Sequence, residues 1–232
     1  MEHEIELHIL KKLMYAKDLG YNDILDKQFP SNAFSYHLKK IVDAGYITNK
    51  DGVYNLTPQG MHIMASRDGV SLQEKQKPIV CCFILGVRDD LILVNKRLKQ
   101  PFLHYVGIPG GKLDFGMEVL ESAKQEFLEE TGLTGDFELK CIANAITYEE
   151  DEVAHHILGF TFVAHNLKGD LKEKHREGEN FFIPKDTITK YTTYPDIPTL
   201  VESCFTEGVS HYTFNRTTKD GSFIGIDIKK GL

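Results

Sequence analysis

Along residues 1–65, apolar positions recur with the spacing of short amphipathic helices. The third of these segments has Ser31 at the position of a helix N-cap. Gly20 and Gly45 follow the first and third segments, and glycine is a common stop signal for a helix. The spacing therefore predicts helices over residues 2–18, 22–28 and 31–43.

A hairpin and a fourth helix are predicted next. Two short β-rich runs flank Asp51-Gly52, and this dipeptide favours the tight turn of a hairpin. Thr57 has the side-chain oxygen of an N-cap, and Pro58 suits the first helical position because it lacks a backbone N–H. The predicted strands cover 46–48 and 53–56, and the fourth helix begins at 57–58.

The pattern changes after a polar stretch, residues 66–78, that ends in proline. We expect a domain over 1–70, a linker over 71–78, and a second domain over 79–232 that ends in a hairpin extension. The elements expected in the second domain are strands over 79–87, 91–95, 137–148, 156–164, 211–216 and 222–228, a glycine-rich loop over 107–111, and helices over 118–130 and 195–205. The pattern assigns no function to the C-terminal hairpin.

Composition and charge narrow the class of protein. Of 232 residues, 41% are hydrophobic and 26% are charged, so the chain has enough apolar side chains for a core. The net charge of -7 argues against a strongly basic nucleic-acid-binding protein. The longest apolar run, 79–87, is about half a membrane span, and the N-terminus lacks an apolar signal core. The four cysteines show no Cys-x-x-Cys spacing. We expect a cytoplasmic protein with reduced thiols, no structural zinc and no membrane partner.

The strongest chemical signal is a group of carboxylates on the helix predicted over 118–130. Glu126, Glu129 and Glu130 are separated by three and four residues, so they share one helix face. Each like-charged pair costs about 0.2–0.5 kcal/mol in an isolated helix. A divalent cation would offset this repulsion, and hard oxygen ligands suit Mg²⁺ or Mn²⁺. A solvated acidic face is the alternative interpretation. The apolar residues expected to face a core are Leu120, Ala123, Phe127 and Leu128.

A glycine-rich loop precedes this helix. Gly110 and Gly111 allow the backbone to approach a ligand closely and to offer a carbonyl to a metal. Lys112 can reach a phosphate as a point charge. Together with the carboxylates, the loop and the lysine indicate a site for a phosphorylated substrate. An ordinary glycine turn is the alternative.

The loop and the helix together resemble the Nudix box. In that motif a glycine is followed after five residues by a glutamate, and after seven more by Arg-Glu-apolar-x-Glu-Glu-x-Gly-apolar. The residues that match at this spacing are Gly111, Glu126, Phe127, Glu129, Glu130, Gly132 and Leu133. The resemblance covers about residues 78–208 and implies an α+β protein whose C-terminal domain is a Nudix α/β/α sandwich with a mixed sheet.

Two positions depart from the motif. Met117 replaces its first glutamate, and Gln125 replaces its arginine. In the family these two residues support the loop and orient the catalytic glutamates. Because both are replaced, neither leaves an unpaired charge behind. The two replacements are expected to affect the rate of hydrolysis more than the fold. They also favour the alternative function, a ligand-sensing domain with little turnover.

The resemblance implies roles for individual residues. Glu126, Glu129 and Glu130 would be catalytic and would bind Mg²⁺ or Mn²⁺ with the carbonyl of Gly110. Residues placed to contact the substrate are Arg97, Gly111, Lys112 and Tyr105. The general base or a further ligand often comes from a later loop, where the candidates are Glu177 and Glu179, followed by Glu150 and Glu152. Side chains for which a core or surface role is the stronger interpretation are Phe102, Phe115, His104, His155 and His156.

The first domain resembles the winged helix-turn-helix domains of bacterial and archaeal regulators over about residues 4–68, on the segments 37–47 and 51–60. If it binds DNA, helix 31–43 would enter the major groove. The candidate contacts are Asn32, Ser35, His37, Lys39, Lys40 and Lys50. Residues 1–70 contain eight Lys/Arg and nine Asp/Glu, which is unfavourable for phosphate contacts. Dimerisation or protein contact is the alternative use of this fold.

Two functions from different classes follow. The first is a metal-dependent hydrolase in which water attacks phosphorus of a nucleoside diphosphate linked to another group. The three retained glutamates favour it. The second is a transcriptional regulator in which the Nudix domain senses a nucleotide-like ligand and changes DNA affinity. The domain fusion and the two departures favour that alternative. Resemblance to both families implies a homodimer.

Overall fold

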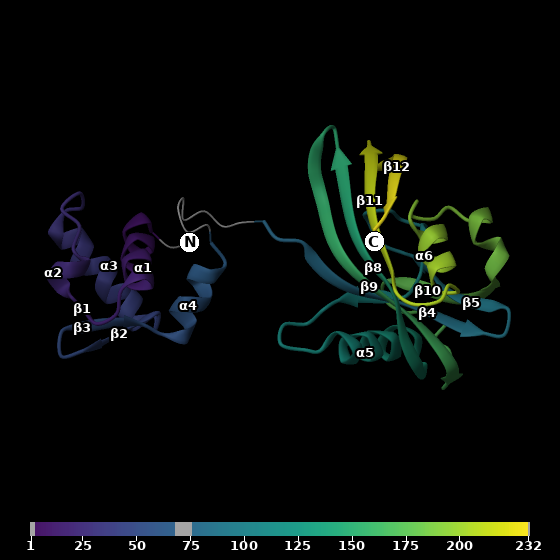
Figure 1. Cartoon of the computed structure of the whole chain (residues 1–232), viewed down its shortest axis with the longest axis horizontal. Helices are drawn as coiled ribbons and strands as arrows, with labels where there is room; N and C mark the ends of the chain where they lie inside the picture. The colour runs from purple at the N-terminus through teal and green to yellow at the C-terminus, as the bar shows by residue number, and fades with distance from the viewer. Residues whose placement is uncertain (1–2, 68–75, 232) are drawn as a thin grey trace. The chain divides into compact units, whose positions relative to one another are not determined.

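The computed structural model describes residues 3–67 and 76–231. The chain divides into two compact units, Met1–Gln76 and Lys77–Leu232 (Figure 1). Most of the segment expected as a linker, residues 71–75, lies outside the described residues. Of the helices in the described ranges, none has the length and apolar character needed to cross a membrane.

The first unit packs four helices against a small antiparallel sheet. The strand order is β1-β3-β2. Fully buried Ile9, Leu10, Ile24 and Phe34 bring three of the helices into one core. Its elements are α1 Glu4–Tyr15, β1 Leu19–Gly20, α2 Tyr21–Ile24, α3 Ser31–Asp43, β2 Ile47–Lys50, β3 Val53–Leu56 and α4 Pro58–Ala65.

Helix boundaries in this unit differ from expectation at three points. The first helix ends at Tyr15 rather than at residue 18, because Ala16 has an extended backbone and Asp18 has a φ of 56°. The second helix, expected over 22–28, spans Tyr21–Ile24. Ser31 is the first residue of α3, and Pro30 occupies the N-cap position without a side-chain hydrogen bond. The prediction for α4 is confirmed: the Thr57 side chain accepts a hydrogen bond from the Gly60 N–H at 3.1 Å.

The second unit is built on a nine-stranded mixed sheet. The main order is β10-β5-β4-β9-β8-β11-β12, with β6 beside β5 and β7 beside β4. The pairs β4–β9 and β8–β11 are parallel, and the others are antiparallel. Its elements are β4 Ile79–Arg88, β5 Leu91–Arg97, β6 Val106–Gly107, β7 Gly110–Lys112, α5 Val119–Thr131, β8 Thr134–Glu149, β9 Glu152–Lys168, β10 Gly178–Pro184, the 3-10 helix η1 Lys185–Lys190, α6 Ile197–Ser203, β11 Ser210–Lys219 and β12 Ser222–Lys230.

Helices cover both faces of this sheet (Figure 1). Alternate residues of β4 face the two layers, as expected for a strand buried on both sides. Ile84 packs in the cluster that contains Phe127 of α5, whereas Leu85 packs in the cluster that contains Leu200 of α6. The three layers and the mixed sheet expected from the sequence are therefore present.

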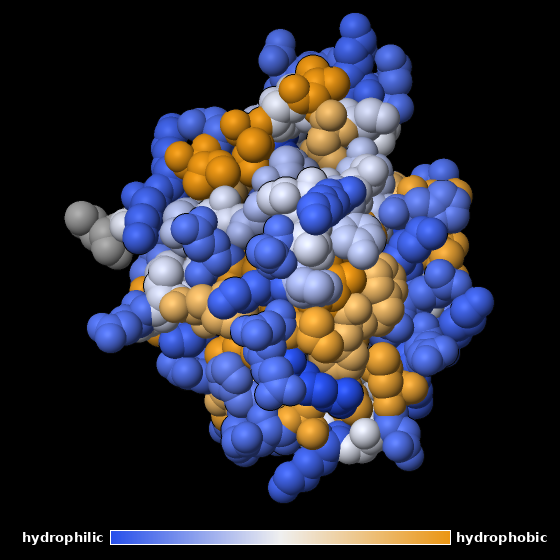
Figure 2. Space-filling view, turned by 90° about the vertical axis from the view of Figure 1, so that its right-hand side faces the viewer, coloured by the Kyte–Doolittle hydropathy of each residue, from blue (hydrophilic) through white to orange (hydrophobic). Residues whose placement is uncertain are grey.

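The face shown in Figure 2 carries patches of hydrophobic residues separated by hydrophilic side chains.

The sequence pattern missed β10, which pairs with β5 along its whole length and forms one edge of the sheet. This strand matters for the site, because it brings the segment before it beside α5.

Candidate active site

Helix α5 places two of the three predicted glutamates along its buried edge. Glu126 and Glu130 are half-buried on one face of α5, next to Phe127, which is fully buried. Leu120 and Leu128, which were expected in the core, are 38% and 47% exposed. This expectation was wrong because the sheet covers a different edge of the helix. The buried residues of α5 are Ser122, Ala123, Phe127 and Thr131.

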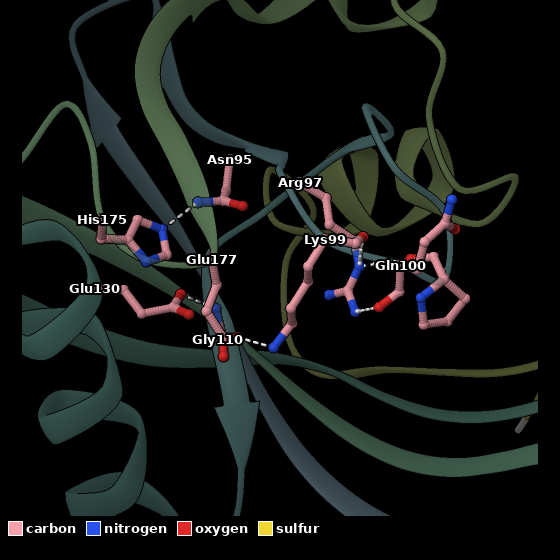
Figure 3. Close-up of polar contacts among 9 residues, drawn as sticks. Asn95, Arg97, Lys99, Gln100, Gly110, Glu130, His175 and Glu177 are labelled. Atoms are coloured by element: carbon pink, nitrogen blue, oxygen red, sulfur yellow. Dashed lines mark hydrogen bonds and ion pairs between the residues drawn. The ribbon is translucent and has the colours of Figure 1, made fainter.

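Strand β7 brings the glycine loop against this edge. The Gly110 N–H donates a hydrogen bond to the Glu130 carboxylate at 3.0 Å (Figure 3). A Cβ on Gly111 would collide with the Glu126 carboxylate, and one on Gly110 would collide with the carbonyl oxygen of Cys82. The backbone of β4 cannot move aside, so glycine is required at position 110, whereas a larger residue at position 111 would displace the flexible carboxylate of Glu126.

Burial and like charge change the acidity of the two half-buried glutamates. Burial, together with the nearby carboxylates of Glu126 and Glu177, raises the pKa of Glu130 to about 7, although the hydrogen bond from the Gly110 N–H lowers it. Burial also raises the pKa of Glu126, and the carboxylates of Glu129, Asp114 and Glu177 add to the effect. A cation among these oxygens would stabilise their ionised form.

The donor chemistry fits a hard divalent cation. Carboxylate oxygens are preferred ligands of Mg²⁺ and Mn²⁺, and repulsion among them is the property that a cation removes. Across residues 3–67 and 76–231, no three His, Cys, Asp or Glu side chains already converge as a metal site. Glu129 is exposed and accepts a hydrogen bond from the Gln125 amide at 2.8 Å. Gln125, which replaces the motif's arginine, thus forms a hydrogen bond with Glu129, one of the predicted metal ligands.

A cavity of about 880 Å³ lies beside the glutamates and contains all the predicted substrate-contacting residues in its wall. The predicted site residues that line it are Arg97, Tyr105, Gly110, Gly111, Lys112, Glu126, Glu129, Glu130 and Glu177. The structure therefore brings together the glycine loop, the acidic helix and residues from β5 and the segment before β10. A cavity of this size with convergent polar groups is typical of a small-molecule site.

Arg97 and Lys99 organise one side of this cavity. The Arg97 guanidinium donates hydrogen bonds from Nε to the carbonyl oxygens of Lys99 and Pro101 at 3.0 and 2.6 Å. Lys99 forms an ion pair with Glu177, and its hydrogen bond lowers the pKa of that carboxyl (Figure 3). Lys99 is a cavity cation that the sequence reasoning missed.

Three polar side chains join α5 to β5 and β10. The Asn95 amide donates to Asn180 Oδ1 at 2.8 Å and lies 2.9 Å from His175 Nε2. Asn180 in turn donates to the carbonyl oxygens of Glu130 and Lys172, both at 2.9 Å. Burial lowers the pKa of His175, which favours the neutral ring as an acceptor. No local sequence pattern predicts that Asn95, His175 and Asn180 come together, because they are far apart in the sequence.

The remaining candidates of the second unit do not line the cavity. Glu179 pairs with Lys174 at 3.0 Å. His156 Nε2 lies 2.7 Å from the Asn144 side-chain oxygen across the β8–β9 pair. Phe115 is 95% exposed. The candidates outside the cavity lining are Glu150, Glu152, Glu179, Phe102, Phe115, His104, His155 and His156.

In the first unit, four of the candidate DNA contacts have partners within the protein. Asn32 Oδ1 accepts a hydrogen bond from the Ala33 N–H at 2.8 Å. Lys40 Nζ and His37 Nδ1 lie 2.6 and 2.8 Å from Oε1 of Glu6, whose side chain is 3% exposed. The Ser35 hydroxyl lies 2.8 Å from the Tyr21 hydroxyl. The candidates whose residues are exposed are Asn32, Ser35, Lys39, Lys40 and Lys50.

The second unit is similar to known proteins. The family profile described as NUDIX domain matches residues 75–202. An ADP-ribose pyrophosphatase of Methanocaldococcus jannaschii is 29% identical over 103 residues, which are 44% of this chain and 60% of that protein. The uncharacterized Nudix hydrolase YvcI of Bacillus subtilis is 32% identical over 92 residues, 39% of this chain and 56% of that protein. The chain thus spans less than two thirds of the length of either curated relative.

The fold is also similar to a solved structure. The crystal structure of the mutator MutT protein from Bacillus halodurans has a TM-score of 0.57 and 23% sequence identity. It covers 65% of this chain, and the match includes 97% of that protein. At this identity the likeness concerns the fold.

Proposed function

Because this chain belongs to the NUDIX domain family, we propose that its second unit is a metal-dependent hydrolase of a nucleoside diphosphate linked to another group. The observation that carries the proposal is the meeting of Glu126, Glu129, Glu130 and the glycine loop at one wall of a cavity of about 880 Å³. The ADP-ribose pyrophosphatase among the relatives supports this substrate class.

In this proposal each group of the site has a role. The three glutamates hold Mg²⁺ or Mn²⁺, which supplies positive charge for the phosphate oxygens. Lys99 and Lys112 line the cavity as cations for the diphosphate. Glu126 positions the water that attacks phosphorus, because its carboxylate lies against the glycine loop. Water forms the new bond to phosphorus while the oxygen that bridged the two phosphorus atoms leaves.

The test uses purified protein with Mg²⁺ or Mn²⁺ and a panel of nucleoside diphosphate derivatives. Substituting Glu129→Gln removes one charged ligand and should lower turnover on the order of 100-fold or more. Products are identified by mass spectrometry, so that their masses give the bond cleaved. Glu121→Gln is the matched control, because Glu121 lies on the same helix and pairs with Lys124 on its exposed face.

Turnover that persists at the wild-type rate in Glu129→Gln would contradict the assigned role. A wild-type protein that binds panel members with metal and cleaves none of them would instead favour a ligand-sensing domain. The hydrogen bond between Gln125 and Glu129 is the feature that favours this second outcome, because the motif's arginine is absent there.

We also propose that the first unit is a winged helix that contacts DNA. The order of elements from α1 to β3 and the sheet order β1-β3-β2 support the fold. Helix α3 would enter the major groove with Asn32 and Lys39, and Lys50 on the hairpin would contact phosphate. Lys40 and His37 are held by Glu6, so they are weaker candidates than the sequence indicated.

Binding is tested by fluorescence anisotropy of a labelled duplex library at several salt concentrations. The double substitution Lys39→Glu, Lys50→Glu should weaken binding by on the order of 10-fold and flatten the salt dependence, because phosphate contacts are lost. The double substitution Lys168→Glu, Lys190→Glu at exposed positions of the second unit changes the net charge by the same amount and is the control for charge alone. Equal salt slopes for wild type and the double variant would contradict the proposal.

A further inference from the structure

The C-terminal hairpin reaches the cavity described above. Strands β11 and β12 lie beyond the residues 75–202 that match the NUDIX domain profile. β11 extends the sheet by parallel pairing with β8 and brings Arg216 to the cavity wall. Phe223 of β12 lies within 6 Å, by ring centroids, of both Tyr105 and Tyr194. Part of the cavity wall is therefore made by a segment outside the matched domain.

Arg216 forms a buried ion pair there and has donors to spare. The side chains of Arg216 and Asp196 are each 8% exposed, and Nη1 lies 3.3 Å from Asp196 Oδ1. Among the described residues this is the one hydrogen bond of the guanidinium, and its Nε is buried without a partner. A guanidinium presents five N–H donors, and buried donors are normally satisfied. Nε is enclosed by protein, whereas Arg216 lines the cavity and its Nη2 has no partner among the described residues, so the Nη donors are the ones that a ligand in the cavity would contact.

Aromatic rings stand next to this pair. Tyr105 and Tyr194 both line the cavity, with ring centroids 5.5 Å apart. Behind them Phe102 stacks on Phe223 at 4.6 Å, and the Arg216 guanidinium carbon lies 5.8 Å from the Phe223 centroid. Aromatic faces beside hydrogen-bonding groups suit a flat heterocycle, which can stack and be bonded at its edge.

The opposite charges of Arg216 and Asp196 determine which chemical groups can bind beside them. Arg216 donates and Asp196 accepts, so together they match a neutral edge that offers an acceptor beside a donor. A phosphate group at this position would meet the Asp196 carboxylate. Nucleobases present such edges, since arginine pairs with ring nitrogens and carbonyl oxygens, and carboxylates accept from exocyclic amino groups.

We propose that Arg216 and Asp196 read the edge of the substrate's nucleobase while the base stacks on Tyr105 or Tyr194. The C-terminal hairpin is then the element that determines base specificity. This inference rests on the proposed hydrolase function, because it places the base in the same cavity as the glutamates.

The first experiment measures kcat and KM on two substrate series. In one series the base varies and the second group is constant, as in ADP-, GDP-, UDP- and CDP-glucose. In the other series adenine is constant and the second group varies, as in ADP-ribose and ADP-glucose. We expect wild type to prefer one base by at least about 10-fold, and Arg216→Lys to reduce that preference mainly through KM. Preference in the second series should be unchanged.

Two further variants sharpen the result. Asp196→Asn keeps the side-chain shape and adds a donor, so it should shift preference toward bases that present a carbonyl oxygen at the edge. Arg88→Lys is the matched control, because Arg88 also lies over an aromatic ring, that of Phe182 at 4.6 Å, and does not line the cavity. Unaltered base ratios in both Arg216→Lys and Asp196→Asn, or a change in the second series instead, would overturn the proposal.

A binding measurement separates this inference from the hydrolase proposal. Calorimetry with AMP, GMP, UMP and CMP, which contain no diphosphate linkage, reports base recognition without turnover. Base-selective binding that Arg216→Lys weakens, in a protein without hydrolysis, would retain the inference and reject the hydrolase. Hydrolysis with the same affinity for all four monophosphates would retain the hydrolase and reject the inference.

Discussion

Exposure distinguishes the three glutamates of α5, although they are close in sequence. Glu126 and Glu130 lie along the edge that packs on the sheet, and Glu129 is exposed and bonded to Gln125. Burial raises the pKa of Glu130 to about 7, so this carboxyl changes charge near neutral pH. The pKa of Glu126 is raised as well, so the charge of the site depends on both half-buried glutamates.

A pH dependence of stability follows from Glu130. Its pKa is raised from 4.5 to about 7 in the folded state, so folding favours the protonated form. The contribution is fully present below pH 4.5 and is lost as pH rises through 7. For metal-free protein the loss is on the order of 3 kcal/mol, and Glu130→Gln should abolish it. Urea unfolding in chelator at pH 4.5, 6, 7 and 8 measures the difference, and parallel pH profiles for the two proteins would refute this assignment.

The spacing of residues predicted part of the site. Glu126, Glu129 and Glu130 could be found because helical periodicity places them together. Asn95 and Arg216 could not, since each is one of several polar residues on its strand and nothing in its spacing sets it apart. They reach the cavity through pairing between strands that are far apart in the sequence, and no local pattern reports such pairing.

At the scale of elements, β10 fixes the position of α5. Asn180 on β10 is 2% exposed and donates to the carbonyl oxygens of Glu130 and Lys172, while accepting from Asn95. One amide therefore joins the last turn of α5 to two strands. The glutamates keep their place against the glycine loop partly through this contact.

Replacing Asn180 should loosen this junction. Asn180→Leu removes the side-chain partner of the partly buried carbonyl oxygens of Glu130 and Lys172 and leaves the Asn95 amide with His175 alone, which should cost about 2 kcal/mol of unfolding free energy. Urea denaturation measures the change. Asn215→Leu is the control, because its hydrogen bond to Asp227 is long at 3.5 Å and exposed. An equal effect in both variants would mean that the junction contributes nothing specific.

Elements with capping chemistry were easier to predict than edge strands. Thr57 before Pro58 predicted the start of α4 correctly, because both residues act locally. The range 31–43 was predicted correctly for α3, but Ser31 is not its N-cap, because Pro30 has the extended backbone of that position and Ser31 is already helical. β10 had no clear alternation, and its position depends on pairing with β5.

At the scale of the whole molecule, each unit has its own core. Ile9 and Phe34 belong to the core of the first unit, and Phe127 belongs to a core of the second. The hydrophobic pattern changes character between the two units, which is why the sequence predicted two domains. It could not predict the cavity, because the cavity wall combines strands, loops and the C-terminal hairpin.

Separate cores predict separate unfolding. Ile9→Ala and Phe127→Ala each remove a fully buried side chain and should cost about 2–5 kcal/mol in the unit concerned. Scanning calorimetry of the full chain should show two transitions, with Ile9→Ala lowering the midpoint of one and Phe127→Ala lowering the midpoint of the other. A single transition that both substitutions shift alike would show that the units unfold as one.

The edge strand β12 has a consequence for solubility. It ends the sheet and pairs with β11 on one side, so its other side presents backbone N–H and C=O groups. Ile224 and Ile228 on this strand are 64% and 41% exposed, and such an edge can recruit strands of other molecules into aggregates. Lys229 and Lys230 follow directly, and their positive charges oppose stacking of like edges. The same strand that packs Phe223 against the cavity residues Tyr105 and Tyr194 thus also carries its own protection against aggregation.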